Sequence, residues 1–253
     1  MRLARKAAII TGGSRGIGRA IALAFAREGA KIAIISRTQA RNKEVVKQIL
    51  ASGGEAIAVE ADVSKKEDVD RMVKQTLDAF QRVDILVNNA AVNLPYRRVV
   101  DLTLQEWNWV LSINLTGQFL CAKAVLPNMI EQRSGKIINL SSIGGRRGAA
   151  GRAPYRSTKA AIINFTECLA AEVKEFGIDV NAICPAIVDT DMLRELTRGN
   201  LPANVSPPEE IAAVAVFLAS DEGAGVTGTA IDAFGTGNPL FAPLPAIPPA
   251  PKS

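Results

Sequence analysis

The sequence predicts a single doubly wound α/β domain, with a parallel β-sheet of about seven strands flanked by helices. Short β-branched runs alternate with longer stretches of helical periodicity, which is the pattern of stacked βαβ units. The 253 residues fit one α/β domain, and 48% hydrophobic with 22% charged residues is typical of a soluble globular chain. A glycine-rich turn at 11–18, directly after the first strand, favours a ligand-binding version of this fold.

The strands are predicted where short apolar runs are bounded by turn signals. They cover 7–10, 32–35, 56–59, 85–87, 136–140, 178–183 and 229–233. Because longer helical patterns separate them, we expect crossover connections and parallel pairing.

The first three helices are bounded by glycines and by a capping signal. They are predicted over 16–27, 41–50 and 64–80. Gly29 ends the first helix, and Gly53 with Gly54 ends the second. Ser64 and Glu67 have the spacing of a capping box, so we expect Ser64 to begin the third helix.

The later helices are predicted over 103–130, 155–175 and 207–218. Thr103 and Glu106 form a second capping-box pattern, and Pro127 predicts a kink near the end of the same helix. The two prolines after Ser206 begin the last helix.

The domain boundary follows from composition. Residues 1–238 form the α/β domain. In the remaining segment, 239–253, six of fifteen residues are proline, which predicts an extended or disordered tail.

Composition excludes several classes of function. With no histidine, the chain has neither a Ser-His-Asp triad nor a His-ligated metal. Three widely spaced cysteines indicate neither disulfides nor a metal site, which favours a reducing, cytoplasmic compartment. No apolar run reaches the length of a membrane span. The net charge is +5, but the 30 basic residues are spread along the chain among 25 acidic ones. This distribution argues against nucleic-acid binding.

The turn at 11–18 reads Thr-Gly-Gly-Ser-Arg-Gly-Ile-Gly and lies where the first helix begins. Free backbone N–H groups and the helix dipole favour an anion there, and glycine allows a pyrophosphate to approach the backbone. The alternative is a tight structural turn. A P-loop is excluded because Arg19 and Ala20 stand where lysine and Ser or Thr are needed.

The end of the second strand indicates which dinucleotide would bind. Dinucleotide-binding folds place Asp or Glu there to hold the ribose hydroxyls, whereas this chain has Ser36 followed by Arg37. Arg37, together with Arg15 in the turn, is suited to a 2′-phosphate. We therefore expect NADP(H) rather than NAD(H), with a solvated loop arginine as the alternative.

Tyr155 and Lys159 are four residues apart on a predicted helix, so both lie on one face. An ammonium about 4 Å from a tyrosine stabilises the phenolate by about 4 kcal/mol at an effective dielectric of 20, or roughly three pKa units. We expect Tyr155 to exchange a proton near neutral pH.

With these motifs the chain resembles the short-chain dehydrogenase/reductase family over residues 3–237, which implies a Rossmann fold. The motifs occur in order as the turn at 11–18, Asp62-Val63, Asn88-Asn89-Ala90-Ala91, Asn114, Ser142, Tyr155 and Lys159. Alanine replaces the usual glycine at Ala91 and Ala186, and Asp232-Ala233-Phe234-Gly235 also departs from the family pattern.

The resemblance implies carbonyl reduction by hydride transfer from a nicotinamide, with Asn114, Ser142, Tyr155 and Lys159 as the catalytic tetrad. Tyr155 would donate the proton, and Ser142 would hydrogen-bond the carbonyl oxygen. Lys159 would lower the pKa of Tyr155 and hold the nicotinamide ribose, and Asn114 would position a proton-relaying water. Together with the turn and Arg37, the expected cofactor-binding residues are Gly12, Ser14, Arg15, Gly16, Ile17, Gly18, Arg37, Asp62, Val63, Asn89, Ala90, Tyr155, Lys159, Pro185, Ile187, Val188 and Thr190.

Several arginines flank the expected substrate pocket: Arg97, Arg98, Arg146, Arg147, Arg152 and Arg156. They indicate either an anionic substrate or carrier group, or solvated side chains and subunit contacts. Arg156 directly follows Tyr155, so we expect it to point away from the catalytic face. The sequence leaves both interpretations open.

The substrate class follows from the resemblance alone. It favours a small-molecule or carrier-linked carbonyl compound, as in 3-oxoacyl-[acyl-carrier-protein] reductases. The alternatives are an NADP-dependent alcohol, sugar or polyol dehydrogenase and a non-catalytic NADP-sensing protein, although the latter is expected to lack Tyr155 or Lys159. The resemblance also implies a homotetramer.

Overall fold

The computed structural model describes residues 1–236, so the expected tail at 239–253 lies outside the described residues. The strands in this range are β1 (Ala7–Thr11), β2 (Lys31–Ser36), β3 (Glu55–Glu60), β4 (Ile85–Asn88), β5 (Gly135–Leu140), β6 (Ile178–Pro185) and β7 (Ala230–Ala233). The helices are α1 (Gly16–Arg27), α2 (Gln39–Ala51), α3 (Lys66–Phe80), α4 (Leu104–Leu111), α5 (Gly117–Gln132), α6 (Ala153–Val173), α7 (Asp191–Thr197) and α8 (Pro208–Ala219).

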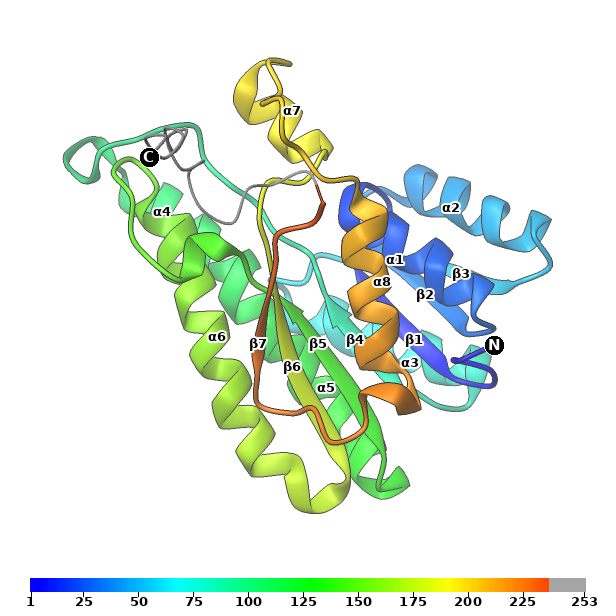
Figure 1. Cartoon of the computed structure of the whole chain (residues 1–253). Helices are drawn as coiled ribbons and strands as arrows, with labels where there is room; N and C mark the ends of the chain where they lie inside the picture. The colour runs from blue at the N-terminus through cyan, green and yellow to red at the C-terminus, as the bar shows by residue number, and fades with distance from the viewer. Residues whose placement is uncertain (237–253) are drawn as a thin grey trace, which may run out of the picture.

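The strands form one parallel sheet in the order β3-β2-β1-β4-β5-β6-β7, which confirms the predicted doubly wound fold. The strand order reverses between β1 and β4. In sheets of this kind, ligands bind outside the carboxyl ends of the strands at that point. Figure 1 shows α7 at this end of the sheet, above the strands.

Two apolar cores hold helices against the two faces of the sheet. One core joins α1, α2 and α8 to one face, where Phe25 and Ile21 are fully buried. The other joins α3, α5 and α6 to the opposite face, where Met72 and Val125 are fully buried. Both faces are covered, which is why the strands are almost continuously apolar.

The first predicted helix has the observed bounds, but the third begins differently. Lys65 is the N-cap of α3, and it makes no side-chain capping bond. The hydroxyl of Ser64 donates instead to the carboxylate of Asp62 at 2.7 Å. The predicted capping box of Ser64 and Glu67 is therefore wrong, because an acceptor two residues upstream takes the Ser64 side chain.

The long helix predicted over 103–130 consists of three pieces. Thr103 and Glu106 form the predicted capping box at the start of α4. A π-helical turn, η2 (Ser112–Thr116), then separates α4 from α5. Pro127 lies inside α5, which continues to Gln132.

The combined stretch Leu104–Gln132 is the one helical segment within residues 1–236 that is long and apolar enough to cross a membrane, by length and composition. In this fold it is a layer helix, because α4 packs on α6 and α5 packs on α3, β4 and β5. Its apolar character is accounted for by these contacts.

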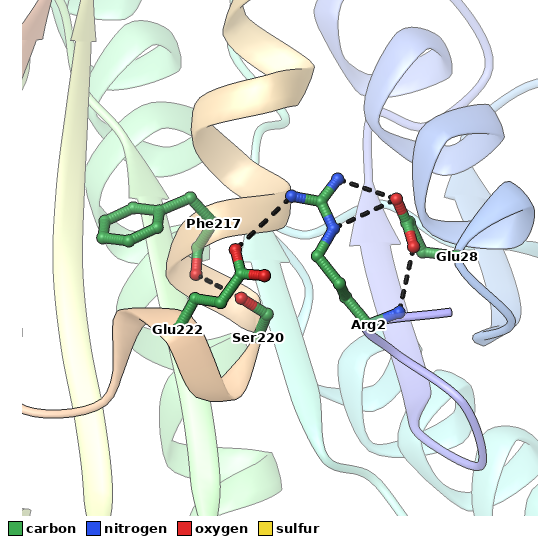
Figure 2. Close-up of polar contacts among 5 residues, drawn as sticks. All are labelled: Arg2, Glu28, Phe217, Ser220 and Glu222. Carbon is green, nitrogen blue, oxygen red and sulfur yellow. Dashed lines mark hydrogen bonds and ion pairs between the residues drawn. The ribbon is translucent and has the colours of Figure 1, made fainter.

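Near the start of the chain, Arg2 contacts residues at the carboxyl ends of α1 and α8 (Figure 2). The Arg2 guanidinium donates to Glu28 at 2.7 Å, and the Arg2 backbone N–H donates to the same carboxylate at 2.9 Å. Arg2 also lies 3.6 Å from Glu222 in the short turn that follows α8. The Ser220 hydroxyl closes the end of α8 by donating to the Phe217 carbonyl. Arg2 thereby bridges the carboxyl ends of α1 and α8.

Candidate active site

The turn between β1 and α1 presents backbone donors to the edge of the sheet. Gly12 and Gly16 adopt φ values of 62° and 53°, a left-handed conformation that glycine adopts without strain. The first turn of α1 contains no acidic residue, and no side chain caps its N–H groups. The N-terminus of α1 therefore offers free donors and the positive end of the helix dipole to an anion.

Asn89 fixes this turn against the end of β4. Its Nδ2 donates to the carbonyls of Thr11 and Gly12 at 3.0 and 3.1 Å. The Thr11 hydroxyl accepts the N–H groups of Asn89 and Ala90 at 3.0 and 3.1 Å. Gly18 packs beneath, where a Cβ would lie 2.3 Å from the Gly12 carbonyl. The turn thus needs glycine at position 18 for close packing.

A cavity of about 300 Å³ extends along the carboxyl ends of the strands, from the end of β2 to α6. The expected cofactor residues that line it are Gly12, Ser14, Arg15, Gly16, Ile17, Arg37, Asp62, Val63, Asn89, Ala90, Tyr155, Lys159, Pro185 and Thr190. Gly18 lies behind the turn, and Ile187 and Val188 line a neighbouring cavity.

The arginines of this cavity differ in their partners. Arg15 pairs with Glu195 at 2.9 Å and lies 3.7 Å from Asp191, so it joins the glycine turn to α7. Arg37 and Arg41 are exposed, and neither forms an ion pair within residues 1–236. Two cationic side chains at the end of β2 are therefore available to an anionic ligand.

Three lining residues near the end of β2 show what sequence reasoning missed. The Ser36 hydroxyl, at the position where a carboxylate would hold the ribose, donates to the side chain of Asn42. Arg41 was missed because α2 was expected to begin there, whereas it begins at Gln39. Arg41 is therefore in the first turn of α2, beside Thr38, and this turn faces the strand ends.

Tyr155 and Lys159 lie one turn apart near the start of α6, and Lys159 Nζ is 5.5 Å from the centroid of the Tyr155 ring. Lys159 is buried, and its Nζ donates to the Leu140 carbonyl at 2.7 Å. Burial lowers the pKa of Lys159 to about 8. Burial also raises the pKa of Tyr155, opposed in part by a hydrogen bond with Ser142. The expected lowering of the Tyr155 pKa is absent here because desolvation is the larger effect.

The adjacent serines 141 and 142 have different partners. The Ser142 hydroxyl accepts the Gly144 N–H at 3.0 Å and caps a short 3₁₀ turn, η3 (Ile143–Gly145). The buried Ser141 hydroxyl donates to the Lys159 carbonyl at 2.7 Å. Ser141 thus anchors α6 to the end of β5, and Ser142 is the serine that bonds Tyr155.

Asn114 lies in the π-helical turn η2 and is fully buried. Its Oδ1 accepts the Val92 N–H at 2.8 Å, and its Nδ2 donates to the Val92 carbonyl at 2.9 Å. Nδ2 also lies 3.3 Å from the Thr158 hydroxyl, which donates to the Tyr155 carbonyl at 2.7 Å. Asn114 therefore ties the loop after β4 to the first turns of α6. Its expected water site stays a prediction.

A second cavity, of about 360 Å³, adjoins the first. The residues that line both are Ile17, Ser141, Tyr155, Pro185, Thr190 and Met192. Ser142 lines the second cavity, as do Leu193 and Leu196 of α7. Tyr155 is thus a common wall of the two cavities, and α7, a helix that was not among the predicted ones, lines the second.

The loop after β6 is held by the segment before α8. The Ser206 N–H donates to the Ile187 carbonyl, and the Asp189 N–H donates to the Ser206 carbonyl, both at 2.9 Å. The Ala186 N–H donates to the Ala233 carbonyl at 3.0 Å. Ala186 is not among the residues with positive φ, so its backbone accommodates alanine where relatives carry glycine.

The fold and the two cavities define a doubly wound α/β protein with a cleft of the dinucleotide-binding type and a Tyr-x-x-x-Lys pair on its wall. The model of the short chain dehydrogenase family matches residues 6–201. The chain belongs to the short-chain dehydrogenase/reductase family, a family of oxidoreductases.

Known relatives cover nearly the whole chain. The 3-oxoacyl-[acyl-carrier-protein] reductase of Synechocystis sp. is 42% identical over 233 residues, covering 89% of this chain and 94% of the relative. The (2S)-[(R)-hydroxy(phenyl)methyl]succinyl-CoA dehydrogenase subunit BbsD of Thauera aromatica is 36% identical, covering 96% and 100%. The crystal structure of 3-ketoacyl-(acyl-carrier-protein) reductase from Brucella melitensis complexed with NADH superposes with a TM-score of 0.87 at 32% identity, covering 92% and 98%.

Proposed function

We propose that this protein is an NADP(H)-dependent carbonyl reductase that acts on 3-oxoacyl thioesters, with Tyr155 as the proton donor. The observation that carries the proposal is the position of Tyr155 on the wall shared by the two cavities. One cavity has the length and the donors for a dinucleotide, and the other holds Ser142 beside Tyr155. The relatives named as 3-oxoacyl-[acyl-carrier-protein] reductases support the substrate class.

The residues of the first cavity fit a dinucleotide. The uncapped N-terminus of α1 suits a pyrophosphate, and Gly12 and Gly18 allow the turn to pack closely against Asn89 in the shape that presents these donors. Asp62 and Val63 line the cavity beyond the turn, where an adenine would lie. Lys159 would hold the nicotinamide ribose at the other end.

Gly18→Ala is expected to weaken dinucleotide binding about fivefold or more, because the turn must shift to relieve an overpacking that costs about 1–3 kcal/mol. The added Cβ would lie 2.3 Å from the Gly12 carbonyl and 2.5 Å from Asn89 Nδ2, so the turn must move. The dissociation constant is measured by fluorescence titration with NADPH, and circular dichroism reports folding. Gly148→Ala is the matched control, because nothing lies within 4 Å of its Cβ position. An unchanged affinity in a folded Gly18→Ala variant contradicts the assignment.

The preference for NADP(H) rests on Arg37 and Arg41, two exposed arginines of the first cavity that have no ion pair within residues 1–236. Their guanidinium groups would bond a 2′-phosphate, and Ser36 leaves no carboxylate to repel it. Arg15 is held by Glu195, so it would have to exchange partners to reach the same phosphate. The Brucella relative was complexed with NADH, so the choice of dinucleotide is tested directly below.

In the proposed reaction the reduced nicotinamide supplies a hydride to the carbonyl carbon. Tyr155 donates its phenolic proton to the carbonyl oxygen, and the Ser142 hydroxyl hydrogen-bonds the same oxygen. Burial raises the pKa of Tyr155, which keeps it protonated at neutral pH, the state that a proton donor needs. Lys159, with a pKa of about 8, carries its charge at pH 7 beside the Tyr155 ring. Asn114 positions the turn that carries both residues.

We also propose a cytoplasmic homotetramer assembled through α5 and α6. Phe119 of α5 is 44% exposed and contacts Phe165 of α6 edge-to-face at 6.5 Å, which leaves an aromatic surface across the two helices. The three cysteines are free thiols, as expected in a reducing compartment.

A substrate panel tests the proposed function. Oxidation of NADPH is followed by absorbance with 3-oxoacyl thioesters, simple ketones and keto sugars. Reduction of the thioesters with the highest kcat/KM supports the proposal. Preference for a sugar or an alcohol in the reverse direction assigns the protein to the alternative dehydrogenases, and tight NADPH binding without turnover of any substrate indicates the cofactor-sensing alternative.

A further inference from the structure

Five of the six arginines that flank the substrate pocket fall into two groups, and the sixth, Arg147, is exposed and does not line the second cavity. Three of them are ion-paired: Arg97 with Glu106 at 3.2 Å, Arg98 with Asp101 at 2.8 Å and Arg146 with Asp232 at 2.9 Å. Arg152 and Arg156 have no carboxylate partner within residues 1–236, and both line the second cavity with Tyr155 and Ser142. The first three arginines are therefore satisfied by carboxylates of the protein itself, and Arg152 and Arg156 are the ones left as cavity cations without such a partner in the described part of the chain.

Arg156 lines the cavity although the sequence predicted that it points away from the catalytic face. The cause is η3, which packs on α6 and closes over its first turn. The side chain of Arg156 lies against Gly144, because a Cβ added to this glycine would lie 3.6 Å from Arg156 Cγ. Its Nη1 donates to the Arg147 carbonyl at 2.7 Å, which fixes the guanidinium at the cavity wall.

Arg152 is fixed on the other side of Tyr155. Its Nη1 donates to the Leu94 carbonyl at 3.0 Å, and its guanidinium lies 5.9 Å from the centroid of the Tyr96 ring. A guanidinium has five N–H donors, and each of these two arginines uses one in a hydrogen bond within the described residues. The remaining donors have no hydrogen-bond partner within residues 1–236, so in this part of the chain they are available to a ligand.

Both charges lie where the dipole of α6 opposes them. Arg152 is the N-cap of α6 and Arg156 lies in its first turn, which contains no acidic residue. A cation at a helix N-terminus is destabilised by the positive end of the helix dipole. Burial raises the pKa of Tyr155, and the charges of Arg156 and Arg152 oppose this rise in small part, in keeping with their position on the same cavity wall. An anionic ligand between them would offset this repulsion.

We propose that Arg152 and Arg156 bind an oxyanion of the carbonyl substrate, either a carboxylate or a phosphate. Apolar side chains of the second cavity, among them Ile143, Ile187, Leu193 and Leu196, would contact the carbon chain of the same substrate. The same chemistry occurs in an oxo acid with a free carboxylate and in a phosphorylated thioester arm of a carrier. The inference rests on the proposed carbonyl reduction and specifies which carbonyl compounds the site selects.

The test compares matched charged and neutral substrates. One arm uses a series of medium-chain oxo acids and their methyl esters, and the other uses a 3-oxoacyl phosphopantetheine thioester and the neutral 3-oxoacyl pantetheine thioester, which lacks only the phosphate. In the wild type we expect kcat/KM to favour the charged member of at least one pair by about tenfold or more, as for one charged hydrogen bond. A preference confined to one arm identifies the oxyanion as carboxylate or phosphate.

Arg152→Gln and Arg156→Gln are each expected to reduce the charged-to-neutral ratio of kcat/KM about tenfold. Any effect of the lost charge on Tyr155 acts on both substrates of a pair and cancels in the ratio. Arg147→Gln is the matched control, because Arg147 is exposed on the same loop and does not line the cavity. Equal efficiency with charged and neutral substrates, or an unchanged ratio in both variants, overturns the inference while the proposed reduction stands. If neither member of any pair is reduced, the proposed function itself fails.

Discussion

Tyr155→Phe is expected to lower kcat for carbonyl reduction by about 10³-fold, within the range that a positioned general acid contributes. The substitution removes only the phenolic oxygen. The ring that lies 5.5 Å from Lys159 Nζ remains, so the affinity for NADPH is expected to change by less than about threefold. Steady-state turnover and fluorescence titration of NADPH measure the two quantities separately.

The chain contains two tyrosines, which provides a close control. Tyr96 is 62% exposed, and Tyr96→Phe keeps the ring beside Arg152, so its turnover is expected to match the wild type. Because the protein has no histidine, no imidazole can substitute as the proton donor in Tyr155→Phe. Turnover of that variant within tenfold of the wild type would falsify the assignment of Tyr155 as the donor.

The features predicted well from the sequence are those set by local signals. α1 has its predicted bounds because glycines stand at both ends, and the capping box at Thr103 forms because Glu106 lies three residues later with no competing acceptor. The alternation of strands and helices was sufficient to predict the doubly wound sheet, since parallel strands require crossover helices. The glycine turn and Tyr155 then fell on the same edge of the sheet because both follow carboxyl ends of strands.

The features missed depend on contacts between residues distant in sequence. Arg15 was expected to serve the dinucleotide alone, but Glu195, 180 positions away, pairs with it in the folded chain. The pocket arginines could not be sorted from the sequence, because the partner of Arg146 is Asp232 on β7. The π-helical turn at Asn114 has no propensity signal of its own. The backbone changes from α-helical to π-helical hydrogen bonding at this turn, where the Asn114 side chain bonds the backbone N–H and carbonyl of Val92.

Arg37→Asp is expected to reverse the dinucleotide preference. Loss of the guanidinium removes a charge-assisted hydrogen bond to the 2′-phosphate, worth about 1.5–3 kcal/mol, and the new carboxylate repels that phosphate. We expect kcat/KM with NADPH to fall by about 10²-fold. With NADH it is expected to rise, because a carboxylate at the end of β2 accepts hydrogen bonds from the ribose hydroxyls. Initial rates with both dinucleotides, on one ketone at about 0.15 M salt, give the ratio.

Lys43→Asp is the control that distinguishes a long-range electrostatic effect of Arg37→Asp from the loss of a direct contact with the 2′-phosphate. Lys43 is exposed on α2, carries the same charge as Arg37 and does not line the cavity. Both substitutions change the net charge by two units, but at this ionic strength charges more than about 8 Å apart in solvent are largely screened. Only Arg37→Asp is therefore expected to reverse the preference. If wild-type enzyme prefers NADH, or if the two variants lose NADPH efficiency equally, Arg37 does not contact the 2′-phosphate, and the cation that does must be sought at Arg41 or Arg15, which line the same cavity.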